Sequence, residues 1–319
     1  MEDLRNWIPY KLENDAGAWQ LRWMDLFAHH IAEPFFDETI SIGLARMRER
    51  SPYHTLSNTD FLVESSFGIN TIAPTCFVFH VSRCGSTLLT QALSTDPGNI
   101  VYAEPPLLDE ILRASLHDKN LTEMEMESWF KAALKMMGQQ RNNQHQMLII
   151  KLDSWHIHFY PLLRKWYPNT PFYFLSRKPD AVIASHDKRR GLHSIPGHIE
   201  ADLLKVKLHD QHYRDFNFFT AQVLEAYYKE ICEIVYANHP LDHFYDYGWG
   251  MNNLITHFFA AIGKEIAKGN EMEKRLSFHS KYPDQRYRVE DEVDISAYPD
   301  THLAYQLLID ALSKKHQLL

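Results

Sequence analysis

The chain has 319 residues, 45% of them hydrophobic, and a formal net charge of −8 at pH 7. That length and hydrophobic content allow one large α/β core, while the acidic balance disfavours a general nucleic-acid binder, which needs a basic face. No long uncharged apolar run would span a membrane, and three cysteines at unrelated spacings form neither a disulfide framework nor a zinc site.

Residues 1–70 precede the first clear strand pattern. Apolar residues such as Leu21, Met24 and Ile31 recur there at roughly helical spacing, and Pro34 marks a break between two helices. We therefore expect a helical N-terminal extension packed on the core, with an aromatic wall of an acceptor site as the alternative. Residues 1–14 lack the apolar region of a signal peptide, which predicts a cytoplasmic protein.

A strand, a tight loop and a helix follow one another after residue 75. Residues 76–81 are an apolar run of strand-forming residues, residues 82–85 form the loop, and Ser86 and Thr87 open a helical pattern. A helix N-terminus offers unpaired N–H groups and the positive end of the helix dipole, so this loop suits a phosphate or sulfate group. Gly85 allows close backbone approach, and the two hydroxyl groups add hydrogen-bond donors.

This loop differs from the ATP-type P-loop, G-x-x-x-x-G-K-[ST], because His80 stands at the first glycine and Ser86 replaces the lysine. The nearby cation is Arg83. With a strand, an arginine, a small residue, Gly85 and two hydroxyl residues, the stretch resembles the phosphosulfate-binding loop of sulfotransferases. The resemblance implies a P-loop NTPase-like sulfotransferase fold and the sulfuryl donor 3′-phosphoadenosine 5′-phosphosulfate (PAPS), bound without a metal.

Two charged residues end predicted strands further along the chain. Residues 100–103 predict a short strand ending at Glu104, and residues 147–150 a buried strand ending at Lys151. Glu104 follows Gly85 at the spacing of the glutamate base in tyrosylprotein-type sulfotransferases, although Ala-Glu-Pro replaces their Gly-Glu-Glu-like turn. The resemblance implies a general base at Glu104 and a lysine that neutralises charge on the leaving phosphate. From position alone, Glu104 is also an N-cap or first-turn acid of the next helix.

A later strand and helix carry an arginine and a serine eight residues apart. Residues 171–175 are strand-like, Arg177 follows them, and Ser185 lies about two turns into the next helix. The pair resembles the sulfotransferase motif for the 3′-phosphate that distinguishes PAPS from ATP, in which arginine forms a two-point fork. The whole resemblance covers residues 76–190, roughly a third of the chain.

The remaining segments predict elements without an assigned role. Residues 187–210, rich in His, Lys and Arg, predict a solvated loop, with a basic lid over the nucleotide as the alternative. Residues 216–236 predict a long buried helix, residues 243–247 a short strand and residues 302–312 a C-terminal helix. Residues 280–288 contain several phosphate-binding groups that could close over a nucleotide.

Together these patterns predict an α/β fold with a mainly parallel sheet flanked by helices, a helical extension over residues 1–70 and a sulfotransferase-like domain over residues 71–319. The resemblance implies sulfuryl transfer from PAPS to a small-molecule or peptide hydroxyl, with adenosine 3′,5′-bisphosphate as product. The implied catalytic residues are Glu104, Arg83 and Lys151. The implied cofactor-binding residues are Arg83, Cys84, Gly85, Ser86, Thr87, Leu88, Arg177 and Ser185.

Two other functions and one modification stay open. An NTP-dependent kinase or NTPase would use the same loop with Asp153 as a magnesium-linked acid, and a non-catalytic nucleotide-binding module would keep the fold without chemistry. Cys84, at a helix N-terminus beside Arg83, is either a reactive thiol or a small packing residue. The sequence predicts neither the acceptor nor the oligomeric state.

Overall fold

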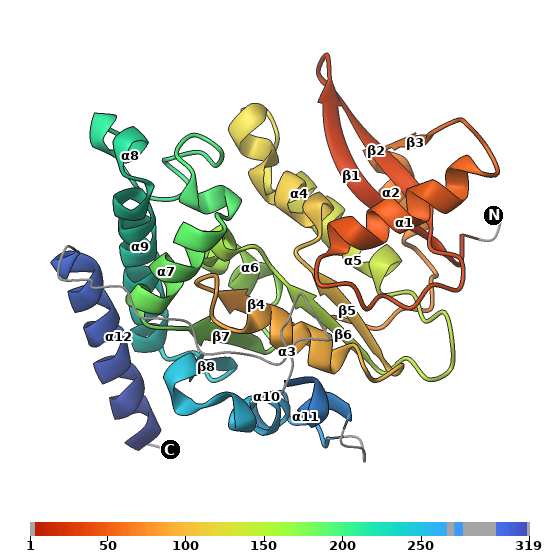
Figure 1. Cartoon of the computed structure of the whole chain (residues 1–319). Helices are drawn as coiled ribbons and strands as arrows, with labels where there is room; N and C mark the ends of the chain where they lie inside the picture. Colours follow the sequence, from red (N-terminus) through yellow and green to blue (C-terminus); the bar gives the residue numbers. More distant parts are fainter. Residues whose placement is uncertain (1–3, 267–270, 277–297, 318–319) are drawn as a thin grey trace. The chain divides into compact units, whose positions relative to one another are not determined.

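The computed structural model describes residues 4–266, 271–276 and 298–317 (Figure 1). The chain forms two compact units: the first unit comprises Met1–Phe77 and Thr90–Leu152, and the second unit comprises Val78–Leu89 and Asp153–Leu319. Residues 280–288, predicted to close over a nucleotide, lie outside the described residues. The domain boundary predicted after residue 70 stays a prediction.

Five strands form the predicted sheet, in the order β5-β6-β4-β7-β8. The strands β4 to β7 are buried along their whole length, because their apolar runs present hydrophobic side chains to both faces. Strand β5 pairs in parallel with β6, and β7 pairs in parallel with β8. The α/β fold with a mainly parallel sheet is therefore confirmed. The bounds are β4 (Cys76–His80), β5 (Asn99–Ala103), β6 (Met147–Lys151), β7 (Phe172–Ser176) and β8 (Asp242–Asp246).

Helices supply the connections that parallel strands require. Helix α5 begins with a capping box, in which the Thr122 hydroxyl accepts a hydrogen bond from the Glu125 N–H and the Glu125 carboxylate accepts one from the Thr122 N–H. In the second unit, α9 packs against α7 and α12 (Figure 1). The principal helices are α3 (Ser86–Leu93), α4 (Pro106–His117), α5 (Glu123–Met137), α7 (Pro179–Lys188), α9 (Phe216–Ala237) and α12 (Pro299–Gln317).

Shorter helices fill the remaining connections. They are η1 (Ser154–Phe159), α6 (Tyr160–Trp166), η2 (Leu192–Ser194), α8 (Asp210–Arg214), η3 (Tyr247–Trp249), η4 (Met251–Asn253), α10 (Leu254–Ala261) and α11 (Glu271–Leu276). Among all the helices in the described ranges, none combines the length and apolar character needed to cross a membrane.

The N-terminal extension is not helical as predicted. It contains the antiparallel strands β1 (Trp7–Asp15), β2 (Ala18–Asp25) and β3 (Thr55–Asn58), with the helices α1 (Phe36–Arg48) and α2 (Thr59–Ser65). The physical reason is the turn at Ala16 and Gly17, where φ values of +50° and +89° join β1 to β2 as a two-residue hairpin. The helical spacing was misleading because tryptophans and other β-formers alternate between buried and less buried positions along β2. The predicted break at Pro34 is followed by a helix, α1.

Candidate functional site

The loop between β4 and α3 has an unusual backbone. Ser82 has a φ of +71°, Arg83 of +50° and Gly85 of +86°, so two residues with side chains occupy the left-handed region. Such conformations cost on the order of 1–3 kcal/mol each and gather at functional sites. Successive N–H groups in a left-handed turn point into one concavity, which is a recurring anion-binding arrangement. The loop predicted to bind an anion therefore has the backbone for that function.

Gly85 is required at its position for two reasons. Its φ of +86° disfavours other residues, and an added Cβ would lie 3.0 Å from Met251 Cε and 3.4 Å from Tyr247 Cδ2. The sequence predicted a close approach of the backbone at Gly85. In the structure, the groups that approach it are the Tyr247 and Met251 side chains, on the segment after β8. Neither Tyr247 nor Met251 was identified from the sequence.

The loop residues differ in accessibility. Arg83, Gly85 and Thr87 are partly exposed, whereas Ser86 and Leu88 are buried. Cys84 is fully buried, which supports the packing interpretation over the reactive-thiol interpretation, because a reactive thiolate needs access to solvent. Among these loop residues, Arg83, Gly85 and Thr87 therefore keep surface that a ligand could reach.

Arg177 is joined directly to this loop. It follows β7, as predicted, and its Nη1 donates a hydrogen bond of 2.8 Å to the Arg83 carbonyl oxygen. The Arg177 guanidinium also lies 4.4 Å from the centre of the Tyr247 ring, and the Arg177 carbonyl accepts a 2.7 Å hydrogen bond from the Tyr228 hydroxyl. Only 8% of Arg177 is exposed, so the side chain has a fixed position. Ser185 lies in α7 and is partly exposed.

The segment after β8 is fixed by Asp246. One carboxylate oxygen accepts a hydrogen bond of 2.6 Å from the Ser176 hydroxyl, and the other accepts bonds from the Gly248 N–H and the Tyr305 hydroxyl. Asp246 is buried, so these contacts anchor the turn that places Tyr247 beside Arg177. The sequence predicted a strand end here without a role. Asp246 links the end of β7 to the segment after β8, which gives this strand end a structural role.

In the first unit, Glu104 and Lys151 form an ion pair at the carboxyl ends of β5 and β6. Lys151 Nζ lies 2.5 Å from Glu104 Oε1, and the Glu104 N–H donates to the Lys151 carbonyl oxygen at 2.8 Å. The Lys151 side chain is fully buried, whereas 23% of the Glu104 side chain is exposed. The ammonium also lies 5.2 Å from the centre of the Phe35 ring. The pair thus presents a partly exposed carboxylate on a buried cation.

Glu104 does not cap the following helix. The N-cap of α4 is Pro105, which makes no side-chain capping bond, and the helix begins at Pro106. The alternative prediction, that Glu104 is an N-cap or first-turn acid of this helix, is therefore wrong. Its φ of +56° lies outside the extended region preferred before a proline. Partial burial and the charge of Glu104 both raise the pKa of Asp37, which places a second carboxyl group near Glu104.

Asp153, the proposed magnesium-linked acid, has a structural contact. It is the N-cap of η1, where its side chain accepts a backbone hydrogen bond and its own N–H donates to His156 Nδ1 at 3.2 Å. This capping role explains an aspartate at the position, and the role of Asp153 as a magnesium-linked acid stays a prediction.

The structure therefore joins Arg177 to the loop and Glu104 to Lys151, and it gives no contact of Ser185 with either group. The second unit contains the loop, Arg177 and Ser185, and the first unit contains the Glu104–Lys151 pair. Tyr247 and Met251 are additions that only the fold reveals, because they approach the loop from a distant part of the chain.

Comparisons with known proteins gave structural similarities alone. No protein-family model and no curated protein match the chain. It is similar to the sulfotransferase domain of the Synechococcus PCC 7002 olefin synthase, with 16% identity over 76% of this chain and 96% of that one and a TM-score of 0.46. It is also similar to a sulfotransferase domain from the curacin biosynthetic pathway, with 14% identity over 76% of this chain and 99% of that one and a TM-score of 0.44.

A third similar structure is a sulfotransferase from Alicyclobacillus acidocaldarius, with 14% identity over 76% of this chain and 95% of that one and a TM-score of 0.43.

Proposed function

We propose that the protein is a PAPS-dependent sulfotransferase that moves a sulfuryl group to a hydroxyl acceptor. The observation that carries the proposal is the contact between Arg177 and the carbonyl of Arg83, which joins the strand-end arginine to the anion loop within one unit. A nucleotide with phosphates at both the 3′ and 5′ positions needs two anion-binding groups in a fixed relation. ATP lacks the 3′-phosphate, so it has no phosphate that would bind to the second anion-binding group.

The donor's 5′-phosphosulfate would be bound by the loop. The hydrogen-bond donors suited to its anionic oxygens are the N–H groups of the loop backbone, the Arg83 guanidinium and the Thr87 hydroxyl. Ser86 occupies the position of the ATP-type lysine, which favours a phosphosulfate over a triphosphate held with magnesium. Arg177 and Ser185 would bind the 3′-phosphate. PAPS supplies the sulfuryl group, and adenosine 3′,5′-bisphosphate is left as the product.

Glu104 would be the general base. A hydroxyl acceptor must lose its proton as its oxygen forms the bond to sulfur and the sulfur–oxygen bond to the 5′-phosphate breaks. The Glu104 carboxylate is partly exposed, and its ion pair with the buried Lys151 ammonium holds it in a fixed position. A role for Lys151 at the leaving phosphate stays a prediction, because its observed contacts are to Glu104 and Phe35.

The proposal is tested by transfer of label from ³⁵S-PAPS to a panel of phenols, alkyl alcohols and tyrosine peptides in EDTA. We expect labelled product and equimolar adenosine 3′,5′-bisphosphate with at least one acceptor, and no requirement for a metal. Magnesium-dependent release of phosphate from ATP, with no turnover of PAPS, would contradict the proposal and favour phosphoryl transfer. The cytoplasmic location stays a prediction.

A further inference from the structure

The anion loop is attached to a buried histidine that the sequence did not identify. The Ser82 hydroxyl lies 3.1 Å from His186 Nε2, and the Ser82 N–H donates to His80 Nδ1 at 3.0 Å. Ser82 is the first of the loop residues with a left-handed backbone. Its main chain and its side chain are therefore each fixed by an imidazole, one from the end of β4 and one from α7.

The hydrogen bonds of His186 define which ring nitrogen faces the loop. The Gly191 N–H donates to His186 Nδ1 at 3.2 Å, so Nδ1 is an acceptor and Nε2 of the neutral ring carries the proton. Nε2 therefore donates to the Ser82 oxygen. The imidazole is fully buried, and an added Cβ on Gly191 would lie 3.2 Å from His186 Cε1, so the ring has little room to turn.

The segment that follows α7 holds the loop at a second point. The Arg83 guanidinium donates a short hydrogen bond to the carbonyl oxygen of Arg189. Two consecutive loop residues, Ser82 and Arg83, are thus held by two residues that lie three positions apart, His186 and Arg189.

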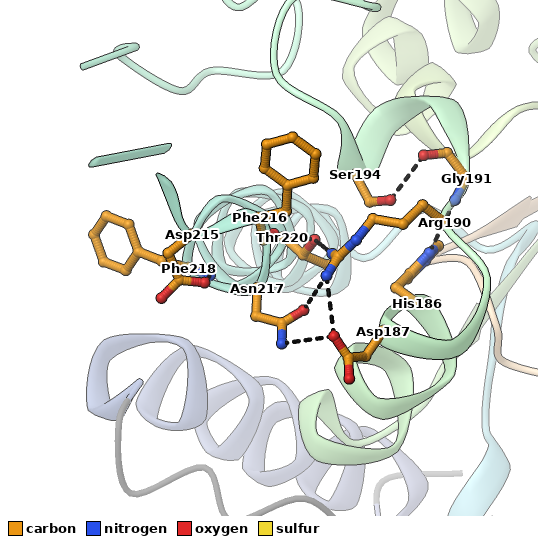
Figure 2. Close-up of polar contacts among 10 residues, drawn as sticks. All are labelled: His186, Asp187, Arg190, Gly191, Ser194, Asp215, Phe216, Asn217, Phe218 and Thr220. Atoms are coloured by element: carbon orange, nitrogen blue, oxygen red, sulfur yellow. Dashed lines mark hydrogen bonds and ion pairs between the residues drawn. The ribbon is translucent and has the colours of Figure 1, made fainter. Parts of the chain in front are cut away.

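This segment is itself fixed to α9. Figure 2 shows the Arg190 side chain between the two helices, bonded to Asp187 of α7 and to Asn217 and Thr220 of α9. The Asn217 amide also donates to Asp187, and the Ser194 hydroxyl donates to the Gly191 carbonyl (Figure 2). The solvated loop predicted over residues 187–210 is therefore wrong in part, because polar contacts order its beginning and Ser194 is fully buried.

We propose that His186 is a positioning residue for the anion loop, which holds Ser82 in its left-handed conformation so that the loop N–H groups face the 5′-phosphate of the nucleotide. This inference rests on the proposed function. A left-handed serine relaxes toward the commoner backbone regions unless surrounding contacts hold it, and the imidazole is one of those contacts.

The test uses two substitutions of His186, which differ in the hydrogen bond of its ring that they keep. In His186→Asn the amide oxygen can still accept from Gly191, but the side chain is too short to reach Ser82. In His186→Gln the longer amide can still donate to Ser82. Each is titrated calorimetrically with adenosine 3′,5′-bisphosphate and with adenosine 3′-monophosphate, which lacks the phosphate assigned to the loop. Ser82→Ala removes the same contact from the other side, should His186→Asn fail to fold.

We expect His186→Asn and Ser82→Ala each to weaken binding of the bisphosphate about tenfold, the equivalent of one hydrogen bond, and the double variant to lose little more. Binding of the 3′-monophosphate should change less than about twofold, and His186→Gln should restore bisphosphate affinity to within about threefold of the parent.

Equal weakening of both ligands, or unchanged bisphosphate affinity, would overturn the positioning role while leaving the proposed function intact. A parent protein that binds no bisphosphate would overturn the proposed function and this inference with it.

Discussion

The Glu104–Lys151 pair gives the sharpest mutational prediction. Glu104→Gln removes the negative charge that faces a fully buried ammonium but keeps an amide oxygen that can accept from Lys151 Nζ. Breaking a buried ion pair by removing one partner costs about 3–5 kcal/mol. Because the Glu104 side chain is 23% exposed and the hydrogen bond persists, we expect the free energy of unfolding to fall by about 2 kcal/mol.

The same change should lower catalysis by a separate and larger amount. Loss of a general base reduces turnover by about 10²–10⁴-fold, which corresponds to roughly 3–5 kcal/mol in the activation free energy. Binding of adenosine 3′,5′-bisphosphate should remain parental, because Glu104 is proposed to accept a proton from the acceptor and not to bind the nucleotide.

Three measurements separate these effects: urea unfolding, calorimetric titration with the bisphosphate and turnover of PAPS. The matched control is Glu127→Gln, the same substitution in the same unit, in a partly exposed ion pair with Lys131 on α5. Parental turnover by a folded Glu104→Gln protein would refute the assignment of the base. An unchanged unfolding free energy would refute the contribution of the ion pair.

Three further predictions concern the loop, the 3′-phosphate and pH. Gly85→Ala, with a φ of +86° and a Cβ contact of 3.0 Å to Met251, should weaken bisphosphate binding by more than about tenfold in a calorimetric titration; a loss under twofold contradicts the geometry. Arg177→Lys keeps the charge but loses the fork, so we expect at least about tenfold weaker binding of the bisphosphate and a smaller loss for adenosine 5′-monophosphate, which lacks the 3′-phosphate. Burial raises the pKa of Glu110 to about 8, although a hydrogen bond from the Leu12 N–H acts in the opposite direction. Between the ordinary pKa of a glutamate and pH 8, Glu110 therefore keeps its proton in the folded state and loses it in the unfolded state. Unfolding free energy should therefore fall as the pH rises from 5 to 8, and Glu110→Gln should flatten that fall; identical profiles would contradict it.

Much of the fold could be predicted because each buried strand is a short apolar run between polar turns. The chemistry at the strand ends could be predicted too, since Glu104, Lys151 and Arg177 follow such runs directly. The N-terminal hairpin was missed because its turn contains one glycine, and the left-handed Ala16 has no sequence signal.

The supporting contacts could not be predicted for a different reason. Ser82 and His186 are far apart in the sequence, as are Gly85 and Met251, and no local pattern links such residues. Their proximity depends on the order of strands in the sheet and on the path of the chain after α7 and β8. Periodicity shows that a helix or strand is buried, but it does not show which polar side chain another element will present to it.

The central claim is that the site binds a nucleotide phosphorylated at both the 3′ and 5′ positions without a metal. The most direct test is calorimetric titration of the parent protein with adenosine 3′,5′-bisphosphate in EDTA, beside ATP with magnesium, repeated on Arg177→Ala. We predict tight metal-independent binding of the bisphosphate that is lost in the variant. Binding of magnesium-ATP alone would contradict the account and direct attention to phosphoryl transfer.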